Sequence, residues 1–391
     1  MSHTVEDLIA SHPTNPVERT GHDTTTDKKW TKEFPAITKL AVRTRHGPYA
    51  QAVQADFEPA LLPLYADDEI RLTERASPPT YRTWKFSTEE DMVNWFHTEV
   101  SNVVLGAFTK APSVLQSSHE KPLADAKADE VVDVAYSIAR GRTRTHIVIG
   151  EMKRNLIRNR QWQDGNLESS AQKSLSRELR GYAYKYSCPQ IFCFDGEYLV
   201  LLQFRAMSVN DIKSQDCKVD CWVIPRVNDG GVTLRYALYR FLVQGFRRFQ
   251  GMIAYPVRLR DIPPYKREWY NGRPLWKIDG TIVAIPFGHR RRVDARYGAF
   301  YWSATEESDV PLLTEQGSWV YDTEGLWELD YPLPWEVHPE NSHQVLASHS
   351  PDQNVTSSMS HEGRATSGSH QTVATSMNPF LIEDDDLYLA N

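Results

Sequence analysis

Three residues with reactive side chains stand in or at the ends of two apolar segments. Asp133 interrupts one apolar, β-branched stretch, and Glu151 and Lys153 close the next one. Such stretches are typical of strands, and Gly141 between them indicates a hairpin. Because side chains alternate along a strand, Glu151 and Lys153 share one face. We therefore expect two carboxylates and one ammonium group to meet at one edge of a sheet.

Buried carboxylates need a compensating charge, and a hard divalent cation bound through oxygen atoms commonly supplies it. We expect Asp133 and Glu151, with a backbone carbonyl near Met152, to hold Mg²⁺ or Mn²⁺. A cation so placed can activate water and stabilise negative charge that develops in a reaction. The Lys153 ammonium group would point into the same site.

Two helices are predicted to flank these strands. Ser87 and Glu90 form a capping-box pattern at the start of the first helix, and Glu99 lies at the edge of its apolar stripe. Apolar residues recur every three to four positions from Glu168 to Tyr186, which predicts the second helix. Gln172 flanks the apolar stripe of that helix.

Glu99 on a helix, Asp133 on a strand, Glu151-x-Lys153 on the next strand and Gln172 on the following helix form an ordered succession. This succession resembles the PD-(D/E)XK, or restriction-endonuclease-like, nuclease superfamily, and the body is also similar to uncharacterised fungal proteins of that superfamily. The resemblance implies an α/β (α+β) fold whose central mixed sheet is flanked by helices. In that family the strand acids bind Mg²⁺, the lysine positions or activates the attacking water, and the helix residues adjust metal and substrate. By resemblance, these catalytic roles pass to Asp133 and Glu151, to Lys153, and to Glu99 and Gln172.

The resemblance covers residues 87 to 206 and has two departures. Val132, rather than proline, precedes Asp133, and Ser176 stands four residues after Gln172, where some branches carry tyrosine. Each residue taken alone has an ordinary structural explanation, such as a helix-edge acid or a hairpin residue. Their joint placement favours the functional interpretation.

A basic run surrounds the predicted hairpin. Between residues 140 and 160 the chain carries seven Lys or Arg residues and one acid, Glu151. We expect five of them to bind backbone phosphates of DNA or RNA, with little sequence selectivity: Arg140, Arg142, Arg144, Arg154 and Arg158. The alternative is a solvated charged face.

Composition excludes several classes of protein. The chain has 391 residues, four cysteines and a formal net charge of −7. No apolar segment follows its polar start and none is long enough to span a membrane, so we expect no membrane partner and a location in the nucleus or cytoplasm. Motifs for phosphate loops, dinucleotide folds, zincins and hydrolase elbows do not occur, and Cys217 and Cys221 have no second ligand pair for zinc.

Composition also divides the chain. Residues 1–30 are predicted to be a disordered arm, 31–335 a nuclease-like domain, and 336–391 a disordered acidic tail. Within the domain, 87–206 form the core and 207–335 a C-terminal extension, which we expect to enlarge the same core. The extension includes a helix near 232–252, whose Arg240, Arg247 and Arg248 are predicted to point outward.

A second function remains open. A catalytically inactive member of the same fold would bind nucleic acid or a protein partner, as an accessory factor in an unknown fungal pathway. Its acidic tail, which ends in an alternation of apolar and acidic residues, would then dock on the partner.

Overall fold

A computed structural model gives the fold of the part of the chain described below. All of this part belongs to one compact unit, Met1–Val337, and the predicted acidic tail 336–391 lies outside the described residues. The described residues are 3–19, 24, 28–44, 57–64, 66–110, 113–123, 130–140, 142–227, 231–254, 256–260, 262–294, 299–303 and 321–322.

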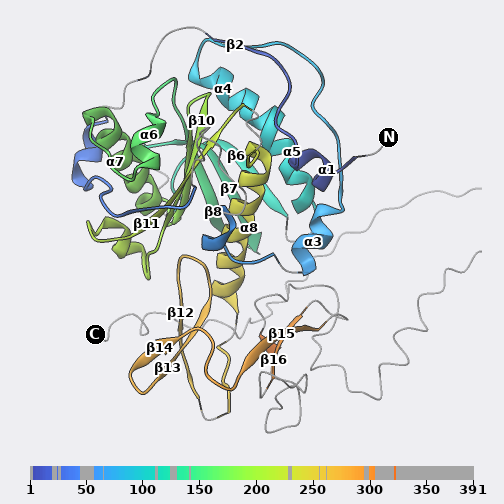
Figure 1. Ribbon diagram of the computed structural model, residues 1–391, viewed down its shortest axis with the longest axis vertical. Helices are drawn as coiled ribbons and strands as arrows, with labels where there is room; N and C mark the ends of the chain where they lie inside the picture. The colour runs from blue at the N-terminus through green and yellow to red at the C-terminus, as the bar shows by residue number, and fades with distance from the viewer. Residues whose placement is uncertain are drawn as a thin grey trace, which may run out of the picture. The chain divides into compact units, whose positions relative to one another are not determined.

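A seven-stranded mixed sheet lies at the centre of the fold (Figure 1). Most neighbouring strands are antiparallel, but β8 runs parallel to β9 and β11 runs parallel to β3. In spatial order the strands are β6 (Val114–Glu120), β7 (Val132–Arg140), β8 (Thr143–Met152), β9 (Gln190–Phe194), β10 (Tyr198–Phe204), β11 (Val219–Pro225) and β3 (Leu40–Val42).

Both predicted hairpins of the core are confirmed. β7 and β8 pair antiparallel, with Val134 opposite Gly150, and β9 and β10 pair around the turn at Asp195 and Gly196. Strand β6, which the sequence pattern did not reveal, adds an edge to the sheet beside β7. The hairpin of β7 and β8 therefore lies inside the sheet, where its apolar side chains are covered on both faces.

Helices cover both faces of this sheet, as Figure 1 shows. On one face α4 (Glu89–Phe96) continues through a π-helical turn, His97–Ser101, into α5 (Asn102–Leu105), beside α8 (Leu234–Ile253). On the other face lie α6 (Asn159–Gln163) and α7 (Ser170–Lys185). The mixed sheet flanked by helices agrees with the predicted fold class. None of the helices in the described part of the chain is long and apolar enough to cross a membrane.

The first described residues are not the disordered arm predicted for residues 1–30. They form β1 (His3–Thr4), α1 (Val5–Ile9) and β2 (Val17–Arg19). Strand β1 pairs with β4 (Arg75–Ala76), which follows α3 (Ala66–Leu72), and β2 pairs with β5 (Trp84–Phe86). Val5, Leu8 and Ile9 of α1 are buried in the same apolar cluster as α4 and α8. A one-and-a-half-turn helix carries too short an apolar pattern for the sequence to show this docking.

The capping box of α4 lies one residue later than predicted. Thr88, not Ser87, is the N-cap: its hydroxyl accepts a hydrogen bond from the Asp91 amide, and Asp91 accepts one from the Thr88 amide at 2.7 Å. The Ser87 amide also donates to Asp91, at 2.8 Å. The sequence alone allows either Glu90 or Asp91 to complete the box. In the structure Asp91 does so, because it accepts hydrogen bonds from both the Ser87 and the Thr88 amide.

The three arginines of α8 that we expected at the surface are buried. Arg247 forms ion pairs with Asp67 and with Asp68, which lies 2.5 Å away and is fully buried. Arg240 pairs with Glu58 at 2.6 Å, and Arg248 donates to Gln190 at 2.9 Å. The prediction was wrong for Arg240 and Arg247 because the segments 57–64 and 66–72 cover that side of α8, and their proline-punctuated sequence gave no pattern to predict it. It was wrong for Arg248 because this side chain points to the sheet.

Gly245 explains how closely α8 approaches the sheet. A Cβ atom at this position would lie 2.2 Å from the carbonyl oxygen of Ile147 in β8. No side chain can be accommodated there without moving helix or strand, so glycine is required.

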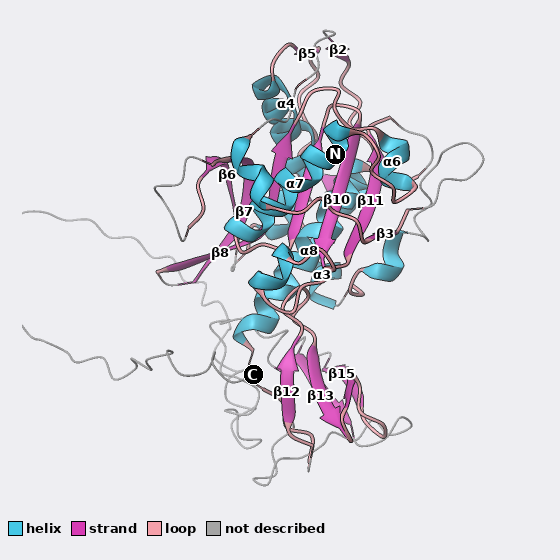
Figure 2. Cartoon of the chain, turned by 90° about the vertical axis from the view of Figure 1, so that its left-hand side faces the viewer, coloured by secondary structure: helices cyan, strands magenta, loops and turns pink. Residues whose placement is uncertain are grey.

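The C-terminal extension enlarges the core as expected only through β11 and α8, which supply buried residues such as Trp222 and Leu238. After α8 the described residues form two separate three-stranded sheets. A small apolar cluster includes Trp276 from the first sheet and Trp302 from the second. The strands are β12 (Pro264–Arg267), β13 (Pro274–Ile278), β14 (Thr281–Val283), β15 (Arg290–Asp294), β16 (Ala299–Ser303) and β17 (Tyr321–Asp322). Figure 2 shows β12 and β13 apart from the main sheet.

The remaining described elements are short. Single-turn 3-10 helices span Lys29–Glu33, Glu58–Ala60, Gly106–Phe108 and Val209–Lys213.

Candidate active site

Asp133 and Glu151 meet at one end of the β7–β8 hairpin, as predicted from the sequence. Asp133 is the second residue of β7 and Glu151 is the last but one of β8, next to the Val134–Gly150 pair. One Asp133 oxygen, Oδ2, accepts a hydrogen bond from the Met152 amide at 2.6 Å. Glu151 is 2% exposed, and no described residue forms a hydrogen bond with its Oε2 atom.

Lys153 points to the same place. Its Nζ atom lies 2.5 Å from Glu151 Oε1 and 3.3 Å from Oε1 of Glu178, a residue of α7. Burial opposes a charge on this side chain, but the two carboxylates hold the pKa of Lys153 above its usual range. Lys153 therefore stays an ammonium ion at any physiological pH.

A second ammonium group enters from the N-terminal segment. Lys28 Nζ lies 2.8 Å from Glu178 Oε1 and 3.2 Å from Glu151 Oε1, and it donates to the Tyr182 hydroxyl at 2.5 Å. That hydroxyl in turn donates to the Val131 carbonyl oxygen at 3.0 Å. The backbone of Thr24 bonds to Arg154, so the segment around Lys28 crosses this end of the sheet.

Sequence reasoning missed Lys28, Glu178 and Tyr182. Glu178 and Tyr182 are one helical turn apart, and both lie on the buried stripe that contains Leu175 and Leu179. An acid within an apolar stripe was a signal that could have been used. Lys28 gave no such signal, because it stands among polar residues far from the hairpin in sequence.

Glu99, predicted to adjust the metal, belongs to a different set of contacts. Its Oε1 atom accepts hydrogen bonds from Asn15 at 2.6 Å and from the Trp84 indole at 2.8 Å. Its backbone carbonyl accepts from Arg235 at 2.7 Å. The structure thus makes Glu99 a buried link between the N-terminal segment, β5 and α8.

Gln172 also has structural partners. Its side-chain oxygen accepts from the Trp162 indole at 2.6 Å and from the Arg158 amide at 3.1 Å, and its amide group donates to the Leu156 carbonyl at 2.8 Å. These bonds fix the segment that follows β8. Gln172 can affect the site only through that segment.

Glu89 takes the place beside Asp133 that we expected for Glu99. Burial raises the pKa of Asp133, and the negative charge of Glu89 adds to that effect. Glu89 Oε1 is buried without a hydrogen-bond partner. His119 lies near the same acids, with its Nε2 atom 3.4 Å from Glu90 and 4.0 Å from Asp133. The first turn of α4, not its π-helical turn, thus faces the strand acids.

The pKa values of the buried glutamates Glu151 and Glu178 are shifted in opposite directions. Burial and the nearby Asp133 raise the pKa of Glu151 to about 8, although Lys153 opposes that shift. Glu178 behaves in the opposite way, because Lys153 and Lys28 override its burial and hold the pKa of Glu178 below its usual range. Glu151 is therefore the glutamate that more readily takes up a proton, and Glu178 is the one that stays ionised beside the lysines.

This proton predicts a pH dependence of stability. Folding raises the pKa of Glu151 from 4.5 to about 8, so the associated stabilisation is complete below about pH 4.5 and is lost as pH rises toward 8. In EDTA, wild type should lose more free energy of unfolding than Glu151→Gln between about pH 5 and pH 8. Urea denaturation at each pH measures this difference, and parallel profiles for the two proteins would contradict it.

The acids suit a divalent cation in their donor chemistry. His119 Nε2 lies 4.0 Å from Asp133 Oδ1, and Glu151 Oε2 and Glu89 Oε1 have no hydrogen-bond partner among the described residues. Within the described residues no group of three or more His, Cys, Asp or Glu side chains is close enough to enclose a metal ion. Mg²⁺ needs no such group, because one or two carboxylates, water and substrate phosphates commonly complete its shell. Asp133 and Glu151 could therefore hold it.

The predicted basic patch divides into two parts. Arg154 and Arg158 follow β8 at the acid end of the hairpin, and the Arg154 guanidinium donates to the Ser87 carbonyl just before α4. Arg140 and Arg142 are exposed at the opposite end, where Arg144 pairs with Glu120. Seven residues of extended strand separate Arg140 from Asp133, or roughly 20 Å.

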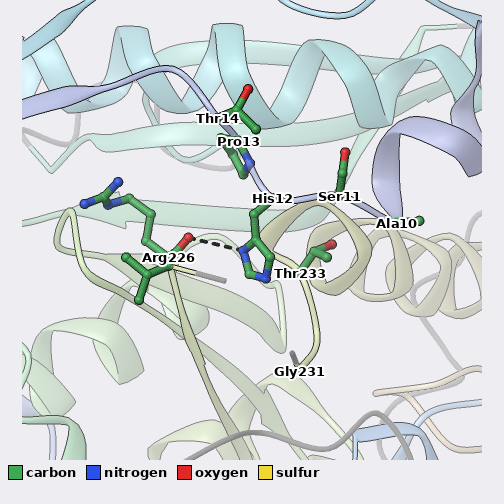
Figure 3. A pocket seen from close by; sticks show the side chains of 9 residues that line it. Ala10, Ser11, His12, Pro13, Thr14, Arg226, Gly231 and Thr233 are labelled. Atoms are coloured by element: carbon green, nitrogen blue, oxygen red, sulfur yellow. Dashed lines mark hydrogen bonds between the residues drawn. The ribbon is translucent and has the colours of Figure 1, made fainter. Parts of the chain in front are cut away.

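A separate pocket of about 500 Å³ contains none of these acids. His12, Thr14, Arg226 and Thr233 are among its lining residues, and the His12 ring contacts the Arg226 carbonyl oxygen at 3.2 Å (Figure 3). The candidate site is therefore the buried acid and lysine cluster at the end of the hairpin, not this pocket.

Comparisons with models of protein families, with curated proteins and with solved structures find no match to this chain. The geometry of the site therefore carries the functional interpretation.

Proposed function

We propose that this protein hydrolyses phosphodiester bonds of nucleic acid with the help of a divalent metal ion. One observation carries the proposal: Asp133 and Glu151 converge at the ends of adjacent strands, with Lys153 bonded to Glu151. Two neighbouring carboxylates and a charged lysine are the groups that such hydrolysis uses.

The order of elements supports a restriction-endonuclease-like core. A helix, the Asp133 strand, the Glu151-x-Lys153 strand and a second helix follow one another, and the next strand lies parallel to the Glu151 strand. This is the succession on which the resemblance rests, with β6 inserted before the Asp133 strand. Glu89 and the pair Glu178 and Tyr182 would replace Glu99 and Gln172 as the helix residues of the site.

Each residue has a role in this proposal. Asp133 and Glu151 would hold Mg²⁺ or Mn²⁺, which when bound lowers the pKa of water and stabilises charge on the attacked phosphate. Lys153 would hydrogen-bond the attacking water or a phosphate oxygen. Glu178 and Tyr182 position Lys153 and Lys28, since both ammonium groups already lie within contact distance of Glu178.

The arginines would orient the substrate. Arg154 and Arg158 are close enough in sequence to Lys153 to contact phosphates beside the cleaved bond. Arg140 and Arg142, roughly 20 Å away along the hairpin, would contact the backbone several nucleotides distant. Such contacts are insensitive to base sequence, so DNA and RNA both remain substrates to test.

Lys28 favours a second candidate function, an inactive nucleic-acid-binding or protein-binding member of the same fold. Its ammonium group already supplies a positive charge between Glu151 and Glu178, where an active site would rely on a metal ion. An inactive protein would keep this ion pair and use only its basic surfaces, with the acidic tail 336–391 as a protein-docking element.

A cleavage assay separates the two. The purified full chain is incubated with supercoiled plasmid and with labelled single-stranded DNA and RNA, in Mg²⁺, in Mn²⁺ and in EDTA. Metal-dependent nicking or shortening supports the nuclease. Binding to the same substrates in EDTA, with no cleavage in either metal, supports the inactive module.

A further inference from the structure

The outer face of the β12–β13–β14 sheet displays an aromatic ring between two lysines. Lys266 Nζ lies 5.3 Å and Lys277 Nζ 5.8 Å from the centre of the Tyr265 ring, which is 44% exposed. Ile282 stands directly opposite Lys277 on β14 and is 49% exposed. We call these four residues, Tyr265, Lys266, Lys277 and Ile282, the tyrosine–lysine face.

The opposite side of this sheet is already covered. Trp276 is fully buried, donates to the Val257 carbonyl at 3.1 Å and contacts the Trp302 ring edge-on at 4.9 Å. Since side chains alternate along β13, covering Trp276 leaves Lys277 on the outer side. The tyrosine–lysine face thus lies on the side of the sheet opposite the buried Trp276.

The charge of this region selects an anionic partner. From residue 256 to residue 303 the chain has ten Lys or Arg residues and four Asp or Glu residues. Strands β12, β13 and β14 contain three bases and no acid, and Glu268 and Asp279 directly follow β12 and β13. The excess of positive charge is local to this stretch, because residues 304–335 carry eight Asp or Glu residues and no Lys or Arg.

We propose that the tyrosine–lysine face binds single-stranded nucleic acid, with a base stacked on Tyr265 and phosphates on Lys266 and Lys277. Base stacking on an exposed aromatic ring and backbone contacts from flanking lysines are how single strands are bound without sequence selectivity. The face would hold the substrate of the proposed nuclease, and the inference rests on that function only for the choice of nucleic acid as the partner.

Binding of a fluorescein-labelled oligothymidylate to the full chain tests the proposal, measured by anisotropy in EDTA so that no cleavage occurs. Tyr265→Ala should weaken binding roughly tenfold or more, because one base loses its stacking partner. The double variant Lys266→Glu, Lys277→Glu should weaken binding further. It should also reduce the slope of log Kd against the logarithm of the salt concentration by about one to two. Circular dichroism and the melting temperature confirm that each variant is folded.

Matched controls separate the face from general charge. Tyr265→Phe keeps the ring and should bind as wild type does. Lys173→Glu with Lys218→Glu makes the same change of charge at two exposed lysines outside the tyrosine–lysine face and should weaken binding much less. Equal affinity of wild type and Tyr265→Ala would overturn the proposal, as would equal losses from the two lysine pairs.

Two further results distinguish this proposal from the proposed function. A protein that binds oligonucleotide through Tyr265 but cleaves nothing in Mg²⁺ or Mn²⁺ contradicts the nuclease and supports the face. A protein that cleaves, but whose affinity does not change in Tyr265→Ala, supports the nuclease and overturns the face. Binding of anionic phosphatidylserine vesicles that needs Tyr265, with no oligonucleotide binding, would also overturn it.

Discussion

Replacing Glu151 by alanine is expected to abolish both the stabilisation by Mg²⁺ and the cleavage of nucleic acid. Wild type should melt several degrees higher in saturating Mg²⁺ than in EDTA, because the ion binds only the folded state and relieves repulsion between Asp133 and Glu151. Glu151→Ala should show no such shift, and its cleavage rate should fall by roughly a thousandfold. Differential scanning fluorimetry and a plasmid assay measure the two effects.

Two control variants make this result specific. Glu99→Gln changes an equally buried glutamate, 1% exposed, whose partners are Asn15 and Trp84, so it should keep the Mg²⁺ shift. Lys153→Ala should also keep the shift but lose most of the rate, since an ammonium group cannot ligate the ion. An identical Mg²⁺ response in wild type and Glu151→Ala would mean that the acids are structural.

Arg247→Met is expected to cause the largest loss of stability. Arg247 is fully buried in α8 and pairs with Asp67 and Asp68, and Asp68 is itself fully buried. Removing the guanidinium leaves buried carboxylate charge with less compensation, at a cost of about 3–5 kcal/mol in the free energy of unfolding. Urea denaturation followed by tryptophan fluorescence measures that loss.

The exposed Arg142 provides the matched control. Arg142→Met should change the free energy of unfolding by less than about 0.5 kcal/mol, because no buried charge is left behind. Asp68→Asn combined with Arg247→Met should recover part of the loss, since one stranded charge is removed with its partner. A loss below about 1 kcal/mol for Arg247→Met alone would show that the ion pair contributes little.

The hairpin and both acids could be predicted because their signals are local. Alternating apolar residues around Gly141 and Gly196 define the strands, and Asp133 and Glu151 stand out as acids within them. The three- to four-residue period likewise predicted α7 and α8. Each of these patterns fits within about twenty residues, and burial of one apolar face enforces it.

The remainder of the site depends on contacts between distant segments. Lys28 reaches Glu151 across the fold, and Glu89 faces Asp133 only because α4 packs with its first turn toward β7. Glu99 was placed in the site from its position in the order of elements, yet a π-helical turn and the N-terminal segment direct it elsewhere. Helix periodicity gives a face of a helix but not the neighbour that covers it.

The parallel pairing of β3 with β11 sets the order in which this protein can fold during synthesis. Leu40 is a partner of Val219, so the early strand cannot join the sheet until the ribosome has released β11. Val5, Leu8 and Ile9 also wait for α8, which emerges later still. Closing such long loops is slow and leaves apolar segments exposed meanwhile. The apolar N-terminal segment therefore lacks its native contacts until the last helix of the core has left the exit tunnel.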